Sequence, residues 1–497
     1  MENLQLNGQN YCRRSRSTRH AFTALFTVAL LLASATSSVA SGRRARLSSD
    51  LAAQMNSASS GPFDLIFSGP PERTDRLVKR HGLTIKKVLS SGAVVRASRA
   101  ALTALSNDPE VEALSGDGVV RSQMAVSTAT TGAEAAWAGT VASLGSVNGR
   151  GIGVAILDSG IADHPALRDR VVASMNFTDS EDDGRDEYGH GTHIAGIIAA
   201  RSFKNSAEGA ESGMAPAAHL INLKVLGADG SGRVSNVIEA IDWAIRYRKA
   251  LGIRVLNLSL GAVPTQSYKD DPLGQAVKRA VEAGLVVVAS AGNYGINDKG
   301  QLVYGCITSP GNSPYVITVG AIRTQGTADK GDDEVAPWSC KGPTLFDHIV
   351  KPDLVAPGSK IVSTAATGAT LMTQFPDRLV DGPGARDYFS MSGTSMSSAF
   401  VAGAVALLLD GRGDLTPLEV KMTLQASADF MPSAGVLAGG AGSLNLEGIG
   451  PFVASVKGLR LTEERGYAYP PSAQHLLKSE TIIWGDKAQG DTIIWGD

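Results

Sequence analysis

The chain has 497 residues, of which 43% are hydrophobic and 19% are charged, and its formal net charge is −2. This length allows one large domain with accessory pieces, and the composition is that of an ordinary soluble globular protein. A charge so close to neutral gives no support to nucleic acid or an anionic membrane as a partner.

The N-terminus has the pattern of a secretory signal peptide. Four arginines between positions 13 and 19 precede an apolar run from Ala21 to Ala33, and small residues follow through Ala40. The run is too short for a comfortable membrane span, although a retained N-terminal anchor is an alternative. We therefore expect a signal peptide over 1–40, a secreted protein with no membrane segment in its mature form, and a linker over 41–60.

A small domain is expected over residues 61–120. Its pattern is strand, helix, hairpin, helix, strand, which is the β-α-β-β-α-β order of the split βαβ (ferredoxin-like) motif. We expect its elements at Phe63–Phe67, Pro71–His81, Leu83–Leu89, Gly92–Ala97, Ser98–Ser106 and Val111–Leu114. The small and polar residues of 121–131 predict an exposed linker after it.

From residue 132 to about 450, apolar strands alternate with helices. The strand Gly153–Leu157 is apolar throughout, as buried parallel strands are. The alternation predicts an α/β fold with a doubly wound, mostly parallel sheet and helices on both faces. Further strands are expected at 220–225, 255–260, 285–291 and 316–321, and helices at 194–200, 234–249 and 274–283.

The C-terminal tail, 451–497, contains the sequence Thr-Ile-Ile-Trp-Gly-Asp twice, at 481–486 and 492–497. Two copies are too few for a solenoid. The tail is either a solvated extension or a segment that docks on a partner.

Three polar residues stand at the ends of apolar segments in the large domain. Asp158 follows the strand Gly153–Leu157, His190 lies between glycines before a helix, and Ser395 precedes the apolar run Val401–Leu409. Alone, Asp158 could cap a turn and Ser395 could be a helix N-cap. Together they are the set that acyl transfer by serine requires: a nucleophile, a base and a carboxylate that holds the base.

A metal site is the rival interpretation of the histidines. His190 and His193 have the spacing H-x-x-H, and Asp182, Asp183 and Asp186 lie nearby. Zinc sites of this type have a glutamate between the histidines and a third ligand, and neither is evident. We expect no catalytic metal.

The three cysteines leave one question open. Cys12 would be removed with the signal peptide, so Cys306 and Cys340 remain as a pair. In an exported protein they could form a disulfide, or they could be two buried free thiols.

Three motifs resemble the signatures of the subtilisin-like serine peptidases (subtilases): Asp158-Ser159-Gly160, His190-Gly191-Thr192-His193 and Gly393-Thr394-Ser395-Met396. The resemblance covers about residues 125–450. It implies that Asp158, His190 and Ser395 form the catalytic triad. It also implies that Asn293, in Ala291-Gly292-Asn293, holds the oxyanion, where the alternative is an ordinary turn residue.

The resemblance also assigns substrate contacts. The segments Gly230-Ser231-Gly232 and Ser259-Leu260-Gly261 would pair with a peptide as an added strand. Thr308 would belong to the floor of the first specificity pocket, which would then be uncharged and suit a hydrophobic or broad range of residues.

The small domain resembles the inhibitory propeptide of the same family, which assists folding and is removed autocatalytically. Processing is then expected within 121–131. Departures from the family pattern are Ala399, Phe400 and Ala166, of which Ala166 replaces an aspartate used as a calcium ligand. No cofactor is expected for the chemistry, and a structural calcium ion is in doubt. The acidic run 179–187 could bind calcium instead, but we expect it to be a solvated loop.

The expected function is therefore that of a secreted serine endopeptidase, made as an autoprocessed zymogen, whose partners are protein or peptide substrates and its own propeptide. One alternative is a catalytically silent relative that binds through its tail. Another is an esterase with the same triad, for which the two peptide-pairing segments would have no use.

Overall fold

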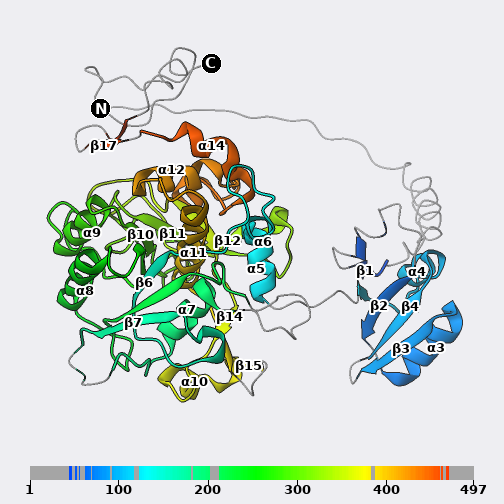
Figure 1. Cartoon of the computed structure of the whole chain (residues 1–497). Helices are drawn as coiled ribbons and strands as arrows, with labels where there is room; N and C mark the ends of the chain where they lie inside the picture. Colours follow the sequence, from blue (N-terminus) through cyan, green and yellow to red (C-terminus); the bar gives the residue numbers. More distant parts are fainter. Residues whose placement is uncertain are drawn as a thin grey trace, which may run out of the picture. The chain divides into compact units, whose positions relative to one another are not determined.

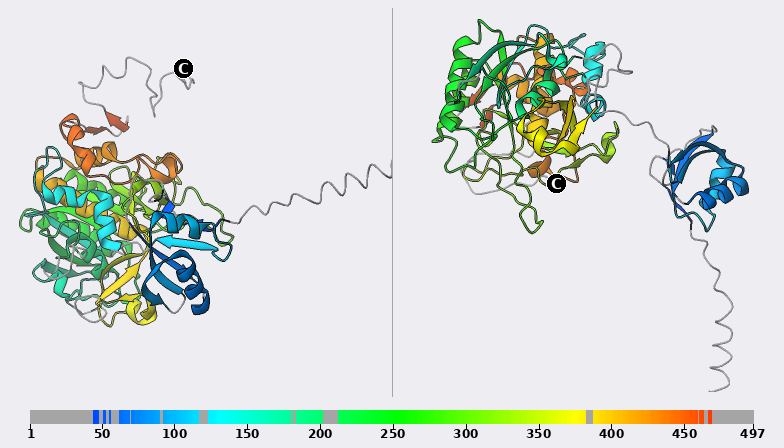
Figure 2. Two further views of the ribbon diagram at one scale, coloured as in Figure 1. Left: turned by 90° about the vertical axis from the view of Figure 1, so that its right-hand side faces the viewer. Right: turned by 90° about the horizontal axis from the view of Figure 1, so that it is seen from below.

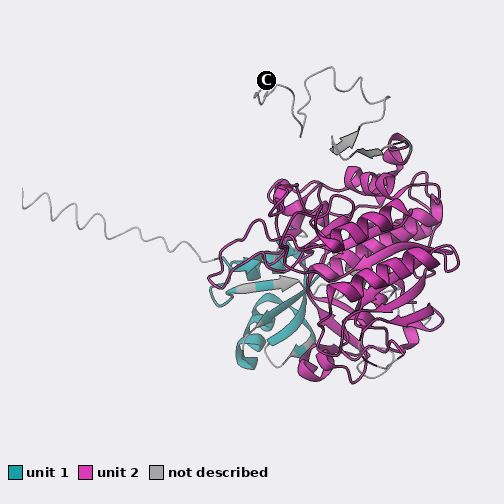
Figure 3. Ribbon diagram, turned by 90° about the vertical axis from the view of Figure 1, so that its left-hand side faces the viewer, with its two compact units in different colours: residues 1–120 teal, residues 121–497 magenta. Residues whose placement is uncertain are grey.

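The structure is a computed structural model that describes residues 44–47, 51–52, 55, 62–68, 70–89, 92–116, 123–178, 180, 183–201, 212–381, 387–458, 460–462 and 466–468. The expected signal peptide, most of the expected linker 41–60 and both copies of the tail hexapeptide lie outside these residues. The chain divides into two compact units, Met1–Val120 and Arg121–Asp497 (Figure 3).

The first unit contains one five-stranded sheet with two helices against it. The strand order is β1-β5-β2-β4-β3, and every described pairing is antiparallel except β1 with β5. Alternate residues of β2 and β4 are buried with Leu77 and Leu102, so α3 and α4 cover one face (Figure 2). The elements are β1 Arg46–Leu47, β2 Phe63–Ser68, α3 Pro71–His81, β3 Thr84–Leu89, β4 Gly92–Ala97, α4 Arg99–Ser106 and β5 Ala113–Gly116.

This unit has the β-α-β-β-α-β arrangement that the sequence predicts, with one addition. Residues 41–60 were expected to be a linker, but β1 pairs with β5, and Leu51 is completely buried in the core of the unit. Such a short strand is not recognisable in an Arg- and Ser-rich segment, because a few apolar side chains are enough to hold it in place.

The second unit is built on an eight-stranded sheet. The order is β12-β11-β10-β9-β6-β8-β7, with β13 also paired to β11, and the β11–β12 pairing is antiparallel while the others are parallel (Figure 1). The strands are β6 Gly153–Asp158, β7 Val171–Asn176, β8 His219–Lys224, β9 Ile253–Leu258, β10 Val286–Ser290, β11 Ile317–Arg323, β12 Glu334–Val335 and β13 Leu354–Pro357. The sheet is therefore the mostly parallel one that the sequence predicts.

Helices cover both faces of this sheet. On one face, α7 His190–Ala199 and α11 Thr394–Gly411 share a core with alternate strand residues such as Val154 and Ile156. On the other, α8 Val234–Tyr247 and α9 Pro272–Glu282 pack on the intervening residues (Figure 1). The strands are apolar throughout because each of their faces is buried under a helical layer.

The central helix α11 is buried along nearly its whole length. It is long and apolar enough to cross a membrane by composition, but 83% of it lies inside the fold. Each fully buried Leu, Val or Phe side chain contributes on the order of 1.5–3 kcal/mol, so this helix anchors the unit. Its first turn is thereby fixed against the sheet.

The remaining elements surround this core. A second, antiparallel sheet has the order β14-β16-β15. The bounds are α5 Gln123–Thr131, α6 Ala133–Ala138, η1 Pro165–Leu167, η2 Lys330–Asp332, β14 Ile361–Thr364, α10 Thr370–Gln374, η3 Pro376–Arg378, β15 Leu379–Val380, β16 Tyr388–Met391, α12 Pro417–Ser427, α13 Val436–Gly439, η4 Glu447–Ile449, α14 Gly450–Ser455, β17 Arg460–Thr462 and β18 Gly466–Ala468.

The expectation of an exposed linker over 121–131 is wrong for most of that stretch. Helix α5 occupies it, and Ser127, Thr128, Thr130 and Thr131 are buried. The Thr131 hydroxyl bonds back to its own helix, at 2.9 Å from the Ser127 carbonyl. Small polar residues therefore mark close packing here, where the sequence alone suggests solvent exposure.

Candidate active site

The site begins with a carboxylate and an imidazole at the ends of neighbouring elements. Asp158 is the last residue of β6 and His190 is the first residue of α7. His190 Nδ1 lies 2.7 Å from Asp158 Oδ1, and the two side chains are 14% and 1% exposed. A Cβ atom on Gly191 would collide with the carbonyl oxygen of Gly160. The glycine after His190 therefore allows the backbone that follows Asp158 to lie against the start of α7.

The environment of His190 favours its protonated form. Burial acts to lower the pKa of His190, but the charge and hydrogen bond of Asp158 outweigh it, and the pKa is raised above its ordinary value of 6.5. The Asp158 carboxylate therefore stabilises the imidazolium form of His190.

The second histidine has a different environment although it lies on the same helix. His193 is completely buried, and its Nε2 lies 3.1 Å from the Ile361 carbonyl and 3.0 Å from that of Phe389. Burial, with a contribution from His190, lowers the pKa of His193 to about 3. The two histidines therefore have separate roles, and within the described part of the chain no three His, Cys, Asp or Glu residues gather as a metal site.

An aspartate of the acidic run holds the loop before His190. Asp186 is buried, although 179–187 was expected to be a solvated loop. Its carboxylate accepts hydrogen bonds from Ser159 Oγ at 2.8 Å, from Gly189 N at 2.7 Å and from Thr192 N at 2.8 Å. Burial raises the pKa of Asp186 in spite of these donors. The burial of Asp186 could not be predicted from the acidic run, because its exposed neighbours in the sequence are charged as well.

Ser395 is the second residue of α11, where backbone N–H groups have no partner inside the helix. The helix dipole adds positive potential at this end. In this structure the Ser395 hydroxyl donates to the Ser259 carbonyl at 2.9 Å, and no described residue forms a hydrogen bond to Nε2 of His190. The serine and histidine are thus carried by two packed helices, α7 and α11, that both begin at this edge of the sheet.

Asn293 follows β10 and faces the first turn of α11. Its Oδ1 accepts hydrogen bonds from Thr394 N and Thr394 Oγ1, both at 3.0 Å. This contact fixes the carboxamide so that Nδ2 points elsewhere. A Cβ atom on Gly393 would lie 3.5 Å from Asn293 Nδ2 and 3.7 Å from Ser395 N, so two N–H donors border one small space. Sequence analysis did not single out Thr394 as the residue that orients this amide.

The expected substrate segments lie near this edge. Gly230, Ser231 and Gly232 belong to an exposed turn in which Leu226 bridges Gly232, and a Cβ on Gly230 would strike the Tyr188 ring. Ser259, Leu260 and Gly261 follow β9. A Cβ on Gly261 would strike the buried Thr308. Glycine at 230 and at 261 therefore allows Tyr188 and Thr308 to lie close to the main chain of these segments.

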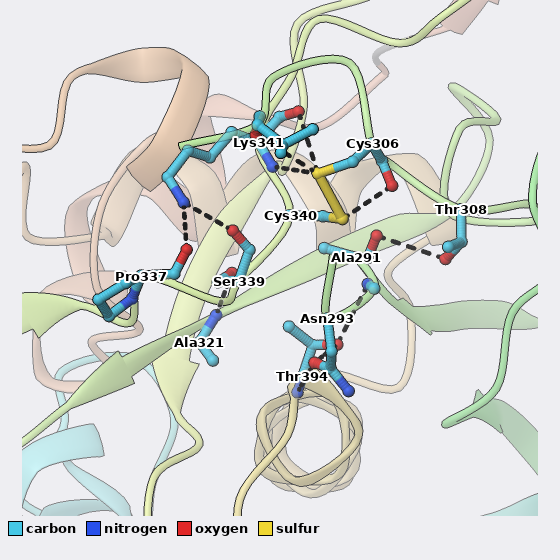
Figure 4. The surroundings of a disulfide bond; sticks show 12 residues. Ala291, Asn293, Cys306, Thr308, Ala321, Pro337, Ser339, Cys340, Lys341 and Thr394 are labelled. Atoms are coloured by element: carbon cyan, nitrogen blue, oxygen red, sulfur yellow. Dashed lines mark hydrogen bonds between the residues drawn. A yellow bond between two sulfur atoms is a disulfide. The ribbon is translucent and has the colours of Figure 1, made fainter. Parts of the chain in front are cut away.

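The cysteines are joined: a disulfide links Cys306 to Cys340 (Figure 4). The bond lies beside Ala291, with which both cysteines form a small apolar cluster. Of the two interpretations that the sequence leaves open, the structure has the disulfide.

Comparisons with known proteins identify the family of this chain. The model of the subtilase family matches residues 149–450. Serine protease AprX of Bacillus subtilis (strain 168) is 38% identical over 307 residues, which are 61% of this chain and 66% of AprX. Subtilisin Savinase of Lederbergia lenta is 35% identical over 301 residues, 61% of this chain and 91% of Savinase. The solved structure of Sphericase, 27% identical, covers 60% of this chain and 92% of its own, with a TM-score of 0.49. The chain belongs to the subtilase family of serine-type endopeptidases.

Proposed function

We propose that this chain is a secreted serine endopeptidase, made as a zymogen, that cuts proteins or peptides through an acyl-enzyme. Asp158, His190 and Ser395 are its triad, and Asn293 with the Ser395 backbone N–H binds the oxyanion. The observation that carries the proposal is the 2.7 Å contact of Asp158 Oδ1 with His190 Nδ1, at the sheet edge where Ser395 lies in the first turn of α11.

The chemistry follows from these groups. The Ser395 hydroxyl leaves the Ser259 carbonyl and gives its proton to His190 Nε2 as its oxygen attacks the scissile carbonyl. Asp158 stabilises the imidazolium that forms, and the two N–H donors beside Gly393 stabilise the negative oxygen. His190 then protonates the leaving amine, and water repeats the sequence on the acyl-enzyme.

Substrate recognition is proposed to use main chain. An extended peptide would add between the exposed turn Gly230–Gly232 and the segment Ser259–Gly261, and its side chain before the cut would face Thr308. Thr308 is uncharged, which supports a hydrophobic or broad preference at that position.

Secretion and zymogen processing are proposed on separate grounds. The pattern of residues 1–40 supports export, and the Cys306–Cys340 disulfide is typical of proteins from oxidising compartments. The ferredoxin-like unit supports a propeptide that assists folding of a large parallel sheet, whose non-local contacts form slowly. Because Ser127, Thr128, Thr130 and Thr131 are buried in α5, we place the processing cut near the start of 121–131.

The test compares the full chain with its Ser395→Ala form and with Ser392→Ala, an exposed serine nearby, as the matched control. The wild type and Ser392→Ala are expected to shorten themselves near 121–131 and digest casein. Ser395→Ala should stay full length and lose activity by more than about 10⁴-fold. An uncut, inactive wild type would favour a silent homologue, and an active Ser395→Ala form would refute the triad.

A further inference from the structure

The segment Ala291–Asn293, which carries the proposed oxyanion amide, is held from two sides. On one side, Thr308 N donates to the Ala291 carbonyl at 3.0 Å. On the other, Cys340 N donates to the Gly292 carbonyl at 2.9 Å. The backbone just before Asn293 is therefore clamped between residues 306–308 and residues 339–341 (Figure 4).

One side of this clamp is firmly anchored. Ser339 Oγ accepts a hydrogen bond from Ala321 N of β11 at 3.0 Å. Lys341 is buried, and its Nζ donates to the carbonyls of Pro337 and Ser339, each at 2.8 Å. The 337–341 loop is thus tied to the sheet and to itself, so it can act as a fixed support.

The other side is anchored at its far end, where Ser309 exchanges two main-chain hydrogen bonds with Ala262, and is tied to the first side at Gly305 and Cys306. Residues 306–308 follow an exposed loop in which Leu302 and Tyr304 face solvent. Gly305 N donates to the Lys341 carbonyl at 2.9 Å, and the disulfide joins the neighbouring residues, Cys306 and Cys340. The only covalent connection across the clamp, among the described residues, is this bond.

The local core could not replace it. The apolar cluster at this point consists of Ala291, Ile307 and the two cysteines, so the disulfide makes up much of its bulk. Without it, Gly305 and Cys306 would be held to the 337–341 loop by main-chain hydrogen bonds next to an exposed loop, and such regions open locally at little cost.

We propose that the Cys306–Cys340 disulfide is a positioning element for catalysis: it fixes the Ala291–Asn293 backbone so that Asn293 Nδ2 stays aimed at the developing oxyanion. The inference rests on the proposed oxyanion role of Asn293. According to this proposal, the bond raises kcat in addition to stabilising the fold. The reason is that a displaced donor forms a weaker hydrogen bond to the oxyanion and stabilises the transition state less.

A double-mutant cycle tests this coupling. The four full-length proteins are the wild type, Cys306→Ser with Cys340→Ser, Asn293→Ala, and all three changes together. Steady-state rates on a peptide p-nitroanilide are measured well below each melting temperature and divided by the concentration of reactive Ser395, titrated with a peptide phosphonate.

Asn293→Ala should lower kcat by about 10²–10³-fold. Removal of the disulfide should lower kcat by about 10-fold, with KM changed less than about threefold, and by less than about twofold in the Asn293→Ala background.

Each outcome decides a separate point. Equal losses of kcat in both backgrounds, or no loss, would overturn the positioning role and leave the triad standing. An unchanged kcat in Asn293→Ala would overturn the oxyanion assignment and this inference with it. Thr416→Ala, which removes the N-cap of α12, should lower the melting temperature with kcat unchanged, which separates stability from positioning.

Reduction of the native protein provides the same test without substitution. Wild type treated with tris(carboxyethyl)phosphine, with two thiols verified by titration, should show the same fall in kcat, and reoxidation should restore it. If reduced protein with an unchanged circular dichroism spectrum keeps its full kcat, the proposal is wrong, even where the serine variants do not fold.

Discussion

Two buried charge clusters in Arg121–Asp497 differ in how completely their polar atoms are used. In the core cluster Lys351–Asp353–Lys421, the Asp353 carboxylate accepts from Lys351 Nζ at 2.6 Å, from Lys421 Nζ at 2.9 Å and from Thr318 N at 2.8 Å. Both ammonium groups also donate to the Val316 carbonyl. The lysines hold the pKa of Asp353 low although burial acts to raise it.

The carboxylate of the edge pair Asp158–His190 is buried as well, but fewer of the pair's polar atoms have hydrogen-bond partners. Asp158 Oδ1 accepts from His190 and from Ser159 N at 2.8 Å, while Oδ2 has no hydrogen-bond partner among the described residues. The second nitrogen of His190 is likewise uncommitted there. A structural cluster satisfies its polar groups, whereas a reactive one retains capacity for a substrate and a proton.

The largest expected effect is on the edge pair. Asp158→Asn should lower kcat by about 10⁴-fold, because a neutral amide neither holds the required tautomer of His190 nor stabilises its charge. The midpoint of urea unfolding should change little. Burst-corrected rates on a peptide p-nitroanilide check the first point, and a loss below about tenfold would contradict the assigned role of Asp158.

The core cluster should show the opposite behaviour. Asp353→Asn leaves two buried ammonium groups without their carboxylate, so we expect the free energy of unfolding to fall by about 3–5 kcal/mol. The measurement is urea denaturation in the Ser395→Ala background, which prevents autolysis. Activity per titrated site of the folded enzyme should be unchanged; a specific loss of kcat would show that the two clusters are coupled.

The pH dependence tests the edge pair in the wild type. His190 must be neutral to act as base, and Asp158 raises its pKa above 6.5, so kcat/KM should fall as pH drops through a midpoint above 6.5. In Asp158→Asn the raising charge is gone while burial remains, so the residual activity should persist to lower pH. A midpoint that does not move would rule out His190 as the titrating base.

The smallest effect is expected at the start of α12, the helix that carries Lys421 of the core cluster. Helix α12 begins with a capping box in which Thr416 and Glu419 exchange hydrogen bonds. Thr416→Ala should cost about 1 kcal/mol of stability and leave kcat and its pH profile unchanged. Thermal unfolding and rate measurements check this, and a shifted pH profile would mean that the site senses distant changes in stability.

Sequence patterns predicted the main elements with small errors at their ends. The strand expected at 153–157 is β6 Gly153–Asp158, and the helix expected at 234–249 is α8 Val234–Tyr247. Edge elements were missed: β7 has only partial burial, and β1 has two residues, so neither carries a strong periodic signal. The buried helix α5 was missed because small polar residues are as typical of close packing as of linkers.

The sequence by itself determined that Asp158, His190 and Ser395 lie, in this order, at the ends of strands and helices. This was possible because a run of apolar residues indicates a buried element without reference to the rest of the fold. Only the tertiary structure decided which of those ends meet. It joined Cys306 to Cys340, buried Asp186 among exposed acids, and gave His190 and His193 opposite pKa shifts. These outcomes depend on distances between segments remote in the chain, and on local burial, which residue order does not specify.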